Sequence, residues 1–337
     1  MESSANIGSK DDYFGVDLGR MIMALAVVLI HINFISIESR YFILRLIASF
    51  VDFAVPFFFI ASGFFLERKV TVNRTRINVI LLDFLKKNIT IYLIWTLLYL
   101  PLTIYGLYTE GNLNIHGVAI FLRNLLVKGE NFYSWPLWYL LSVIYVAAWF
   151  SVWHKLKLSK RFLIISGLTI YLLDAFLLDP LIVYIDNNAI TWFYESTLES
   201  SRILSGFLFI SIGVCLYSYF SKIDFKIGIL GFISGLLLNM LNLPILQILG
   251  LIIGSICLFS VLLDIQYSNG KIGFYMRKFS SVTFFSHMYF FFFLRYLSEV
   301  PAVLQSYEFI VTIIMCILLT FVVLRTQHLC RLFRVIY

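Results

Sequence analysis

The first apolar run of the sequence reads Gly15-Val-Asp17-Leu-Gly-Arg20-Met-Ile-Met-Ala-Leu-Ala-Val-Val-Leu-Ile-His31, and it is the strongest indication of the fold class. Extended to residue 37, this run is long enough to cross a bilayer, because a membrane helix needs about 20 mainly apolar residues. Ionisable side chains inside such a helix are costly and mark functional positions by default. The stretch therefore predicts a membrane helix that carries polar groups for binding or chemistry.

The same pattern recurs along the whole chain, in which 61% of the residues are hydrophobic and 13% are charged. The mean hydropathy is +0.90. We predict one all-α integral membrane domain over 1–337, with a polar tail at 1–14 and a basic tail at 326–337. Residues 113–127 predict a short interfacial or re-entrant helix. About ten transmembrane helices are expected near 16–37, 42–66, 80–104, 134–153, 162–179, 201–220, 227–243, 246–264, 280–297 and 308–325.

The basic residues predict the orientation of these spans, because short cytoplasmic loops collect Lys and Arg. With both termini cytoplasmic, 19 of the 26 basic residues fall in inner segments. The net charge of +7 then faces anionic lipid and requires no nucleic-acid partner. The tail lacks a basic region and a cleavage site, so we expect no cleaved signal peptide. The inner residues are Lys10, Arg68, Lys69, Arg74, Arg76, Lys86, Lys87, Lys155, Lys157, Lys160, Arg161, Lys222, Lys226, Lys271, Arg277, Lys278, Arg325, Arg331 and Arg334.

Two ionisable residues of the first span share one helical face. Arg20 and His31 are 11 residues apart, which places them within about 20° of one another and roughly 16 Å apart along the axis. Asp17 precedes Arg20 by three residues, so these two side chains can pair. The alternative is that Arg20 extends to the inner interface and His31 makes only a helix contact.

The second span runs antiparallel to the first, and matched depth places Asp52 near His31. A carboxylate beside a histidine orients the imidazole and raises its basicity, which suits a general base. Ser62 and Gly63 lie at the same depth in the membrane as Arg20. The arginine together with these two small residues suits a phosphate-bearing ligand. Asp52 can instead pair with Arg45. Pro56 is expected to kink the helix.

Four further residues are candidates for substrate binding, namely Trp138, Tyr139, Arg202 and His287. An aromatic belt explains Trp138 and Tyr139 as well, and a structural hydrogen bond explains the other two. The sequence contains no P-loop, no zinc-binding helix, no nucleophile elbow and no Cys-x-x-Cys pair. We therefore expect no metal, no nucleotide hydrolysis and no covalent serine chemistry.

These motifs together resemble the acyltransferase-3 family of ten-helix membrane acyltransferases. The resemblance rests on Arg20 to His31, on Asp17-Leu-Gly-Arg20 and on Val55-Pro-Phe-Phe-Phe-Ile-Ala-Ser-Gly-Phe-Phe-Leu66. It extends to Phe84-Leu-Lys-Lys87, Leu137-Trp-Tyr-Leu140 and Ser286-His287. The sequence departs from the family pattern at Asn88-Ile-Thr-Ile, where many members carry further arginines, and it lacks the appended esterase-like domain of some members.

This resemblance implies an enzyme of the bacterial cell membrane. It would transfer an acyl group, often acetyl, from cytoplasmic acyl-CoA to a hydroxyl of a cell-surface glycan or lipid-linked precursor. His31 would be the catalytic base, and Arg20 would hold the donor. Matched depth and spacing add Asp52 as the partner of His31, and Asp17, Ser62 and Gly63 as donor-binding residues beside Arg20. No prosthetic group is implied.

A second resemblance leads to a different class of protein. The chain is similar to the membrane half of vancomycin-resistance serine racemases in Trp138-Tyr139 and in the segment around Arg202. That half is credited with binding or moving serine. The sequence shows no counterpart of the cytoplasmic half with its pyridoxal lysine, so racemisation is not expected. The Arg20–His31 pair favours the acyltransferase, because a serine carrier needs no general base.

Overall fold

The computed structural model describes residues 13–31, 41–174, 176, 202–219, 223–241, 243–267, 270–297 and 302–326. These residues form helices and connecting turns, without a strand among them. Residues 1–12 of the predicted polar tail, residues 327–337 of the basic tail and the outer ends of the first and fifth spans lie outside the described residues, as does the side chain of Arg202. The all-helical fold class is confirmed for the described part of the chain.

The helices follow the predicted spans in order. The short 113–127 segment becomes α5 (Ile115–Arg123) followed by a π-helical turn, Asn124–Lys128. The remaining helices are α1 (Phe14–His31), α2 (Phe42–Val51), α3 (Ala54–Val72), α4 (Ile77–Thr109), α6 (Leu137–Lys155), α7 (Lys160–Leu173), α10 (Ser205–Tyr219), α11 (Phe225–Asn239), α12 (Pro244–Asp264), α13 (Gly270–Leu297) and α14 (Ala302–Thr326).

Six stretches of the described chain are long and apolar enough to cross a membrane, which makes the chain a multi-pass membrane protein. Two shorter apolar helices, Ser205–Ser218 and Phe225–Asn239, fall below the required length. The predicted count of ten spans and the cytoplasmic location of both termini therefore remain predictions. The six stretches are Phe14–His31, Phe42–Val72, Arg74–Thr109, Leu137–Lys155, Pro244–Asp264 and Tyr307–Thr326.

The second apolar stretch is broken, because α2 ends at Val51 and α3 begins at Ala54. Pro56 explains the position of this break. Proline has no N–H to donate, and its ring clashes with the carbonyl group four residues earlier, which here belongs to Asp52. The break therefore lies at Asp52 and Phe53, and Pro56 itself sits in the first turn of α3, where proline is tolerated.

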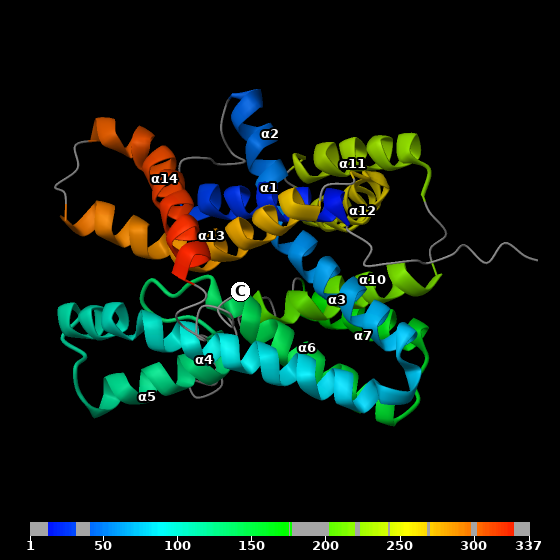
Figure 1. Ribbon diagram of the computed structural model, residues 1–337, viewed down its shortest axis with the longest axis horizontal. Coiled ribbons are helices and arrows are strands. Elements are labelled where there is room, and N and C mark those ends of the chain that lie inside the picture. The colour runs from blue at the N-terminus through cyan, green and yellow to red at the C-terminus, as the bar shows by residue number, and fades with distance from the viewer. Residues whose placement is uncertain are drawn as a thin grey trace, which may run out of the picture.

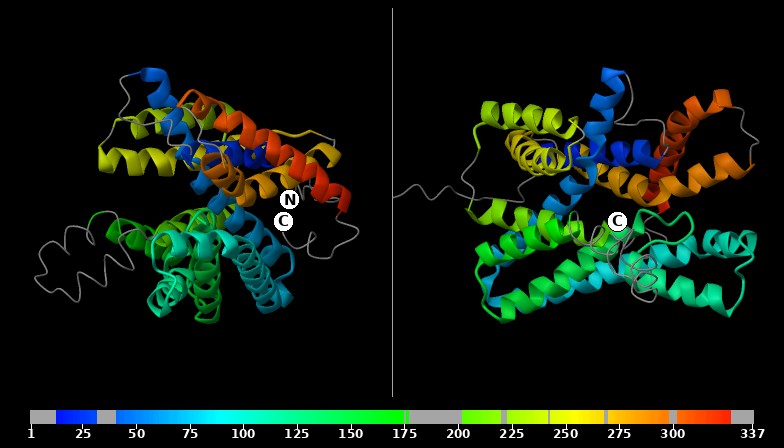
Figure 2. Two further views of the ribbon diagram at one scale, coloured as in Figure 1. Left: turned by 90° about the vertical axis from the view of Figure 1, so that its left-hand side faces the viewer. Right: turned by 180° about the vertical axis from the view of Figure 1, so that it is seen from behind.

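The helices form two groups with α3 running between them (Figures 1 and 2). One group contains α1, α2 and α11 to α14, and the other contains α4 to α7 and α10. Glycines allow α3 to approach α10 closely. A methyl group on Gly63 would clash with the carbonyl oxygen of Ile210, and one on Gly213 would clash with that of Ile60. Such small-residue contacts are typical of helix pairs in membranes.

Candidate functional site

Three hollows of ligand size lie among these helices, and we name each by its lining. The basic cavity, of about 490 Å³, lies among α1, α3, α4, α6 and α13. The Asp52 cavity, of about 420 Å³, lies among α3, α6, α7, α10, α11 and α12. The Trp135 cavity, of about 320 Å³, lies among α4, α5 and the turn before α6. Binding pockets for small molecules typically have volumes of about 300–1,000 Å³.

Five cationic side chains line the basic cavity, namely Arg20, Lys69, Lys87, Arg277 and Lys278. Asp17 is buried beside them and accepts a 3.2 Å hydrogen bond from Arg20 Nη1. Its other carboxylate oxygen accepts from Arg277. The predicted pairing of Asp17 with Arg20 is present, and it also recruits a second arginine. One carboxylate among five cations leaves the lining strongly positive, which favours an anionic ligand.

The lining of the basic cavity also carries hydroxyl groups. Ser62 Oγ lies 2.8 Å from the hydroxyl oxygen of Tyr139, which also donates to the carbonyl oxygen of Phe58 at 3.2 Å. Arg20 and Ser62 therefore line one cavity, as their matched depth predicted. Gly63 does not line it, because this residue faces α10 at the close helix contact.

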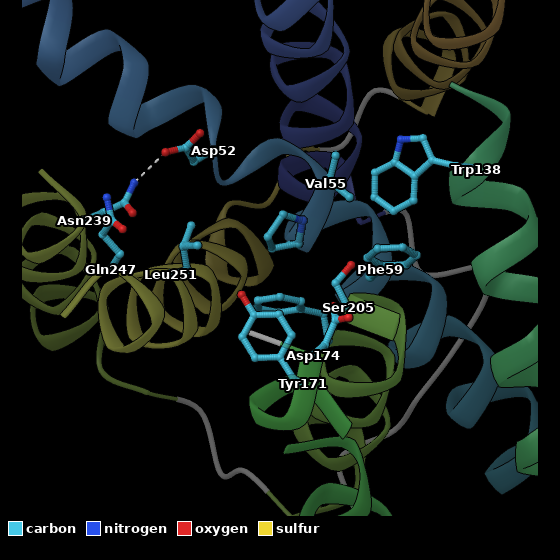
Figure 3. A pocket seen from close by; sticks show the side chains of 12 residues that line it. Asp52, Val55, Phe59, Trp138, Tyr171, Asp174, Ser205, Asn239, Gln247 and Leu251 are labelled. Atoms are coloured by element: carbon cyan, nitrogen blue, oxygen red, sulfur yellow. Dashed lines mark hydrogen bonds between the residues drawn. The ribbon is translucent and has the colours of Figure 1, made fainter. Parts of the chain in front are cut away.

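The Asp52 cavity has the opposite electrostatic character, since its lining includes two carboxylates and no Lys or Arg (Figure 3). Asp52 Oδ2 accepts a 2.9 Å hydrogen bond from Asn239 Nδ2, and Asn239 also donates to Ser49 Oγ at 3.0 Å. The break between α2 and α3 places Asp52 at the rim. The lining residues are Asp52, Val55, Pro56, Phe59, Trp138, Tyr171, Asp174, Ser205, Phe209, Asn239, Gln247 and Leu251.

The basic cavity and the Asp52 cavity lie on opposite sides of the contact between α3 and α6. Phe58 and Tyr139 line the basic cavity, whereas their sequence neighbours Phe59 and Trp138 line the Asp52 cavity. The ring centroids of Phe59 and Trp138 are 6.0 Å apart. Trp138 and Tyr139 thus belong to two different cavities, although the sequence assigned them to one substrate site.

His31 lies at a third place, where its ring contacts two other aromatic rings. The centroid distances are 5.2 Å to His287 and 5.6 Å to Trp135. The predicted neighbour, Asp52, lines a cavity whose lining does not include His31. The alternative partner of Asp52, Arg45, donates from Nη2 to the carbonyl oxygen of Met240 at 2.7 Å. Equal depth in two helices was therefore too coarse a criterion for pairing these side chains.

Sequence reasoning missed most of the residues that give the two larger cavities their charge. Lys69, Lys87, Arg277 and Lys278 were counted as lipid-facing inner charges, and Asp174, which falls inside the predicted span 162–179, was not singled out. A usable signal existed for Lys87, which lies well inside an apolar helix, where a charge normally faces a cavity. Asn239 gave a similar signal at the end of α11.

These features define a multi-pass α-helical membrane protein with cavities of opposite charge. No family model matches the chain, and no solved structure matches it. The chain is similar to an amino-acid racemase of Enterococcus faecalis, with 36% identity over 166 residues. It is also similar to a serine/alanine racemase of Enterococcus gallinarum, with 32% identity over 129 residues.

The similarity to both relatives is partial. The first match covers 48% of this chain and 21% of the relative, and the second covers 36% of this chain and 17% of the relative. The chain thus spans about a fifth of the length of the curated relatives it matches. These relatives overturn the expectation of an acyltransferase, because racemases are isomerases. The assignment of His31 as the base of an acyl transfer loses its support with that reaction.

Proposed function

We propose that this chain binds a small amino acid, of the size and polarity of serine or alanine, and carries it across the membrane. The observation that carries the proposal is the Asp52 cavity, which opens at the break between α2 and α3. A membrane helix that is interrupted beside a cavity is a recurring construction of transporter binding sites, because the free ends of half-helices face the substrate.

The lining of this cavity suits both ends of an amino acid. The carboxylates of Asp52 and Asp174 can accept hydrogen bonds from an ammonium group. The amides of Asn239 and Gln247 can donate to a carboxylate or hydroxyl. The first turn of α3, with Val55 and Pro56, contributes the positive end of a helix dipole to the same cavity.

A carrier also needs access from the other side of the membrane, and the basic cavity suits this role. The aromatic contact between Phe59 and Tyr139, whose ring centroids are 4.8 Å apart, separates the basic cavity from the Asp52 cavity. The cations of the basic cavity would attract the carboxylate end of an amino acid. In the ten-span arrangement with cytoplasmic termini, the many basic residues around this cavity belong to the inner side. A bacterial plasma membrane suits that arrangement and agrees with the source of the relatives.

The names of the relatives support a small amino acid as the ligand, and we do not transfer their racemase reaction to this chain. One is called an amino-acid racemase and the other a serine/alanine racemase. Since the matched part is about a fifth of each relative, we transfer only the kind of ligand, a small amino acid. The membrane helices of this chain are the part of the molecule that the proposal concerns.

The proposal is tested by counterflow in liposomes that contain the purified protein. Liposomes preloaded with unlabelled L-serine should accumulate external radiolabelled L-serine, and empty liposomes should not. Asp52→Asn removes one acceptor charge and should lower counterflow strongly. Asp83→Asn is the matched control, because Asp83 is exposed on α4 and lines neither larger cavity. Wild-type counterflow no faster than that of protein-free liposomes, for both serine and alanine, would exclude the carrier.

A second candidate function has its own observation, the surplus of positive charge in the basic cavity. We propose that this cavity binds a phosphate-bearing anion, with coenzyme A as the first compound to test. Arg20 and Arg277 present planar guanidinium groups that suit phosphate oxygens, and Ser62 adds a hydroxyl. Calorimetry with coenzyme A and with inorganic phosphate tests the proposal. Absence of measurable heat with both would contradict it, as would binding that is unchanged in Arg20→Ala.

A further inference from the structure

The five cations of the basic cavity are close enough to repel one another. Lys87 is repelled by Lys69 and by Arg20. Lys278 is repelled in turn by Lys87 and by Arg277. Like charges that are held together away from bulk water are costly, and an anion bound among them relieves the repulsion. The cluster therefore fits the anion site that we propose above.

The same cavity has an extensive apolar lining, which a small anion such as inorganic phosphate would leave uncovered. Aromatic rings adjoin the cations directly. The guanidinium carbon of Arg20 lies 4.8 Å from the ring centroid of Phe65, and Nζ of Lys278 lies 5.3 Å from that of Phe274. A ligand that carries hydrocarbon next to its anionic group would cover both kinds of lining. The buried apolar lining residues are Ala61, Leu66, Ile91, Leu140, Phe284 and Phe285.

The basic cavity reaches the protein surface within a membrane-spanning stretch. Two of its lining residues are exposed there, namely Lys87 and, at 36%, Phe274. Lys87 belongs to the apolar stretch Arg74–Thr109. Leu82 and Leu93 of this stretch are 51% and 48% exposed, as expected of side chains that contact hydrocarbon. A lysine in such a place extends its ammonium group toward the level of the lipid head groups. A lipid can therefore reach the cavity without leaving the bilayer.

We propose that the basic cavity binds a membrane lipid, with the phosphate group among the cations and the hydrocarbon chains along the buried apolar lining. The inference rests on the anion site proposed above and names the class of its ligand. The guanidinium groups of Arg20 and Arg277 would donate to the phosphate oxygens, and the lysines would add positive charge. A phosphomonoester carries about 1.5 to 2 negative charges at pH 7, so phosphatidic acid is the most sensitive probe.

Native mass spectrometry of the purified full-length protein in a nonionic detergent tests the inference with two matched probes. Dioctanoylphosphatidic acid and glycerol 3-phosphate share a phosphomonoester on glycerol and differ in the hydrocarbon chains. The lipid should bind at least about tenfold more tightly, because only its chains cover the apolar lining. Lys87→Gln should weaken lipid binding by about tenfold, since it removes a charged donor. Lys86→Gln is the matched control and should keep the wild-type affinity, because Lys86 is the exposed neighbour on α4 that does not line the cavity.

The results separate failure of the lipid assignment from failure of the anion site. If Lys86→Gln and Lys87→Gln had the same affinity for the lipid, the lipid would be held by the basic surface in general, and the inference would be wrong. Glycerol 3-phosphate that binds as tightly as the lipid would also overturn it, as would coenzyme A that binds where the lipid does not. In both of these cases the anion site itself would stand. Absence of binding by the lipid, coenzyme A and inorganic phosphate would overturn the lipid assignment and the anion site together.

Discussion

The ring centroid of Phe59 in α3 lies 4.8 Å from the ring centroid of Tyr139 in α6, and the two ring planes are tilted by 33°. Phe59 lines the Asp52 cavity, and Tyr139 lines the basic cavity. At this point the wall between an acidic and a basic cavity consists of two aromatic side chains. A hydrogen bond between the hydroxyl groups of Tyr139 and Ser62 holds the Tyr139 ring in place. An amino acid that passes between the cavities would have to displace these rings, so the pair should control the rate of passage.

Removing the hydroxyl group of Tyr139 should therefore loosen the wall. Tyr139→Phe deletes the hydrogen bonds to Ser62 and to the carbonyl oxygen of Phe58, and each such loss costs about 1 kcal/mol of stability. We expect a small decrease in the thermal unfolding temperature and a faster efflux of L-serine from preloaded liposomes. Tyr267→Phe is the control, because Tyr267 is 52% exposed. Equal efflux rates in Tyr139→Phe and wild type would show that the ring pair does not limit passage.

The break before α3 should be necessary for amino-acid binding. Pro56→Ala restores the N–H that can bond to the carbonyl group of Asp52, and it removes the ring that clashes there. A continuous helix would turn the side chain of Asp52 away from its present position. We expect radiolabelled L-serine to bind at least about tenfold more weakly, without loss of thermal stability, because proline is the poorest helix former.

Pro101→Ala is the matched control for this change, because Pro101 lies inside the membrane helix α4 and lines none of the three cavities. Its binding of L-serine should equal that of the wild type. A Pro56→Ala protein that binds L-serine normally would mean that the broken helix has no part in the site.

The sequence was sufficient to predict the all-helical fold class of the described chain, and the reason is physical. In lipid every backbone group must be bonded within the protein, so an apolar run of sufficient length has almost no alternative to a helix. The Asp17–Arg20 pair was predictable for a similar reason, since it depends on spacing within a single helix.

Contacts between helices depend on how each helix is rotated, and the sequence alone does not determine that rotation. Depth matching predicted Asp52 beside His31, but the break caused by Pro56 changes the direction of α2, and Asn239 of α11 becomes the partner of Asp52. The basic cavity unites Arg20 of α1, Lys87 of α4 and Arg277 of α13, which are far apart in sequence. Nothing in the local pattern indicates which of these helices are neighbours.

The guanidinium geometry of Arg20 should matter for anion binding. Arg20→Lys keeps the charge but loses the planar fork that bonds Asp17 and suits phosphate oxygens. A hydrogen bond to a charged group contributes about 1.5 kcal/mol, so the affinity for coenzyme A should fall about tenfold. Calorimetry measures this change. Arg76→Lys is the control, since Arg76 is exposed. Equal affinities in wild type and Arg20→Lys would contradict a direct contact between the guanidinium and the ligand.

The topology of ten spans with cytoplasmic termini makes the most general prediction, because both proposed functions assign a side to each cavity. The distribution of basic residues predicts that Ser159 lies in an inner loop and Asn187 in an outer loop. In a background without the four native cysteines, Asn187→Cys should react with a membrane-impermeant maleimide added to intact cells. Ser159→Cys should react only after the membrane is permeabilised. If Ser159→Cys were labelled in intact cells and Asn187→Cys were protected, the orientation would be inverted, and the basic cavity would face the outside, where no cytoplasmic anion could reach it.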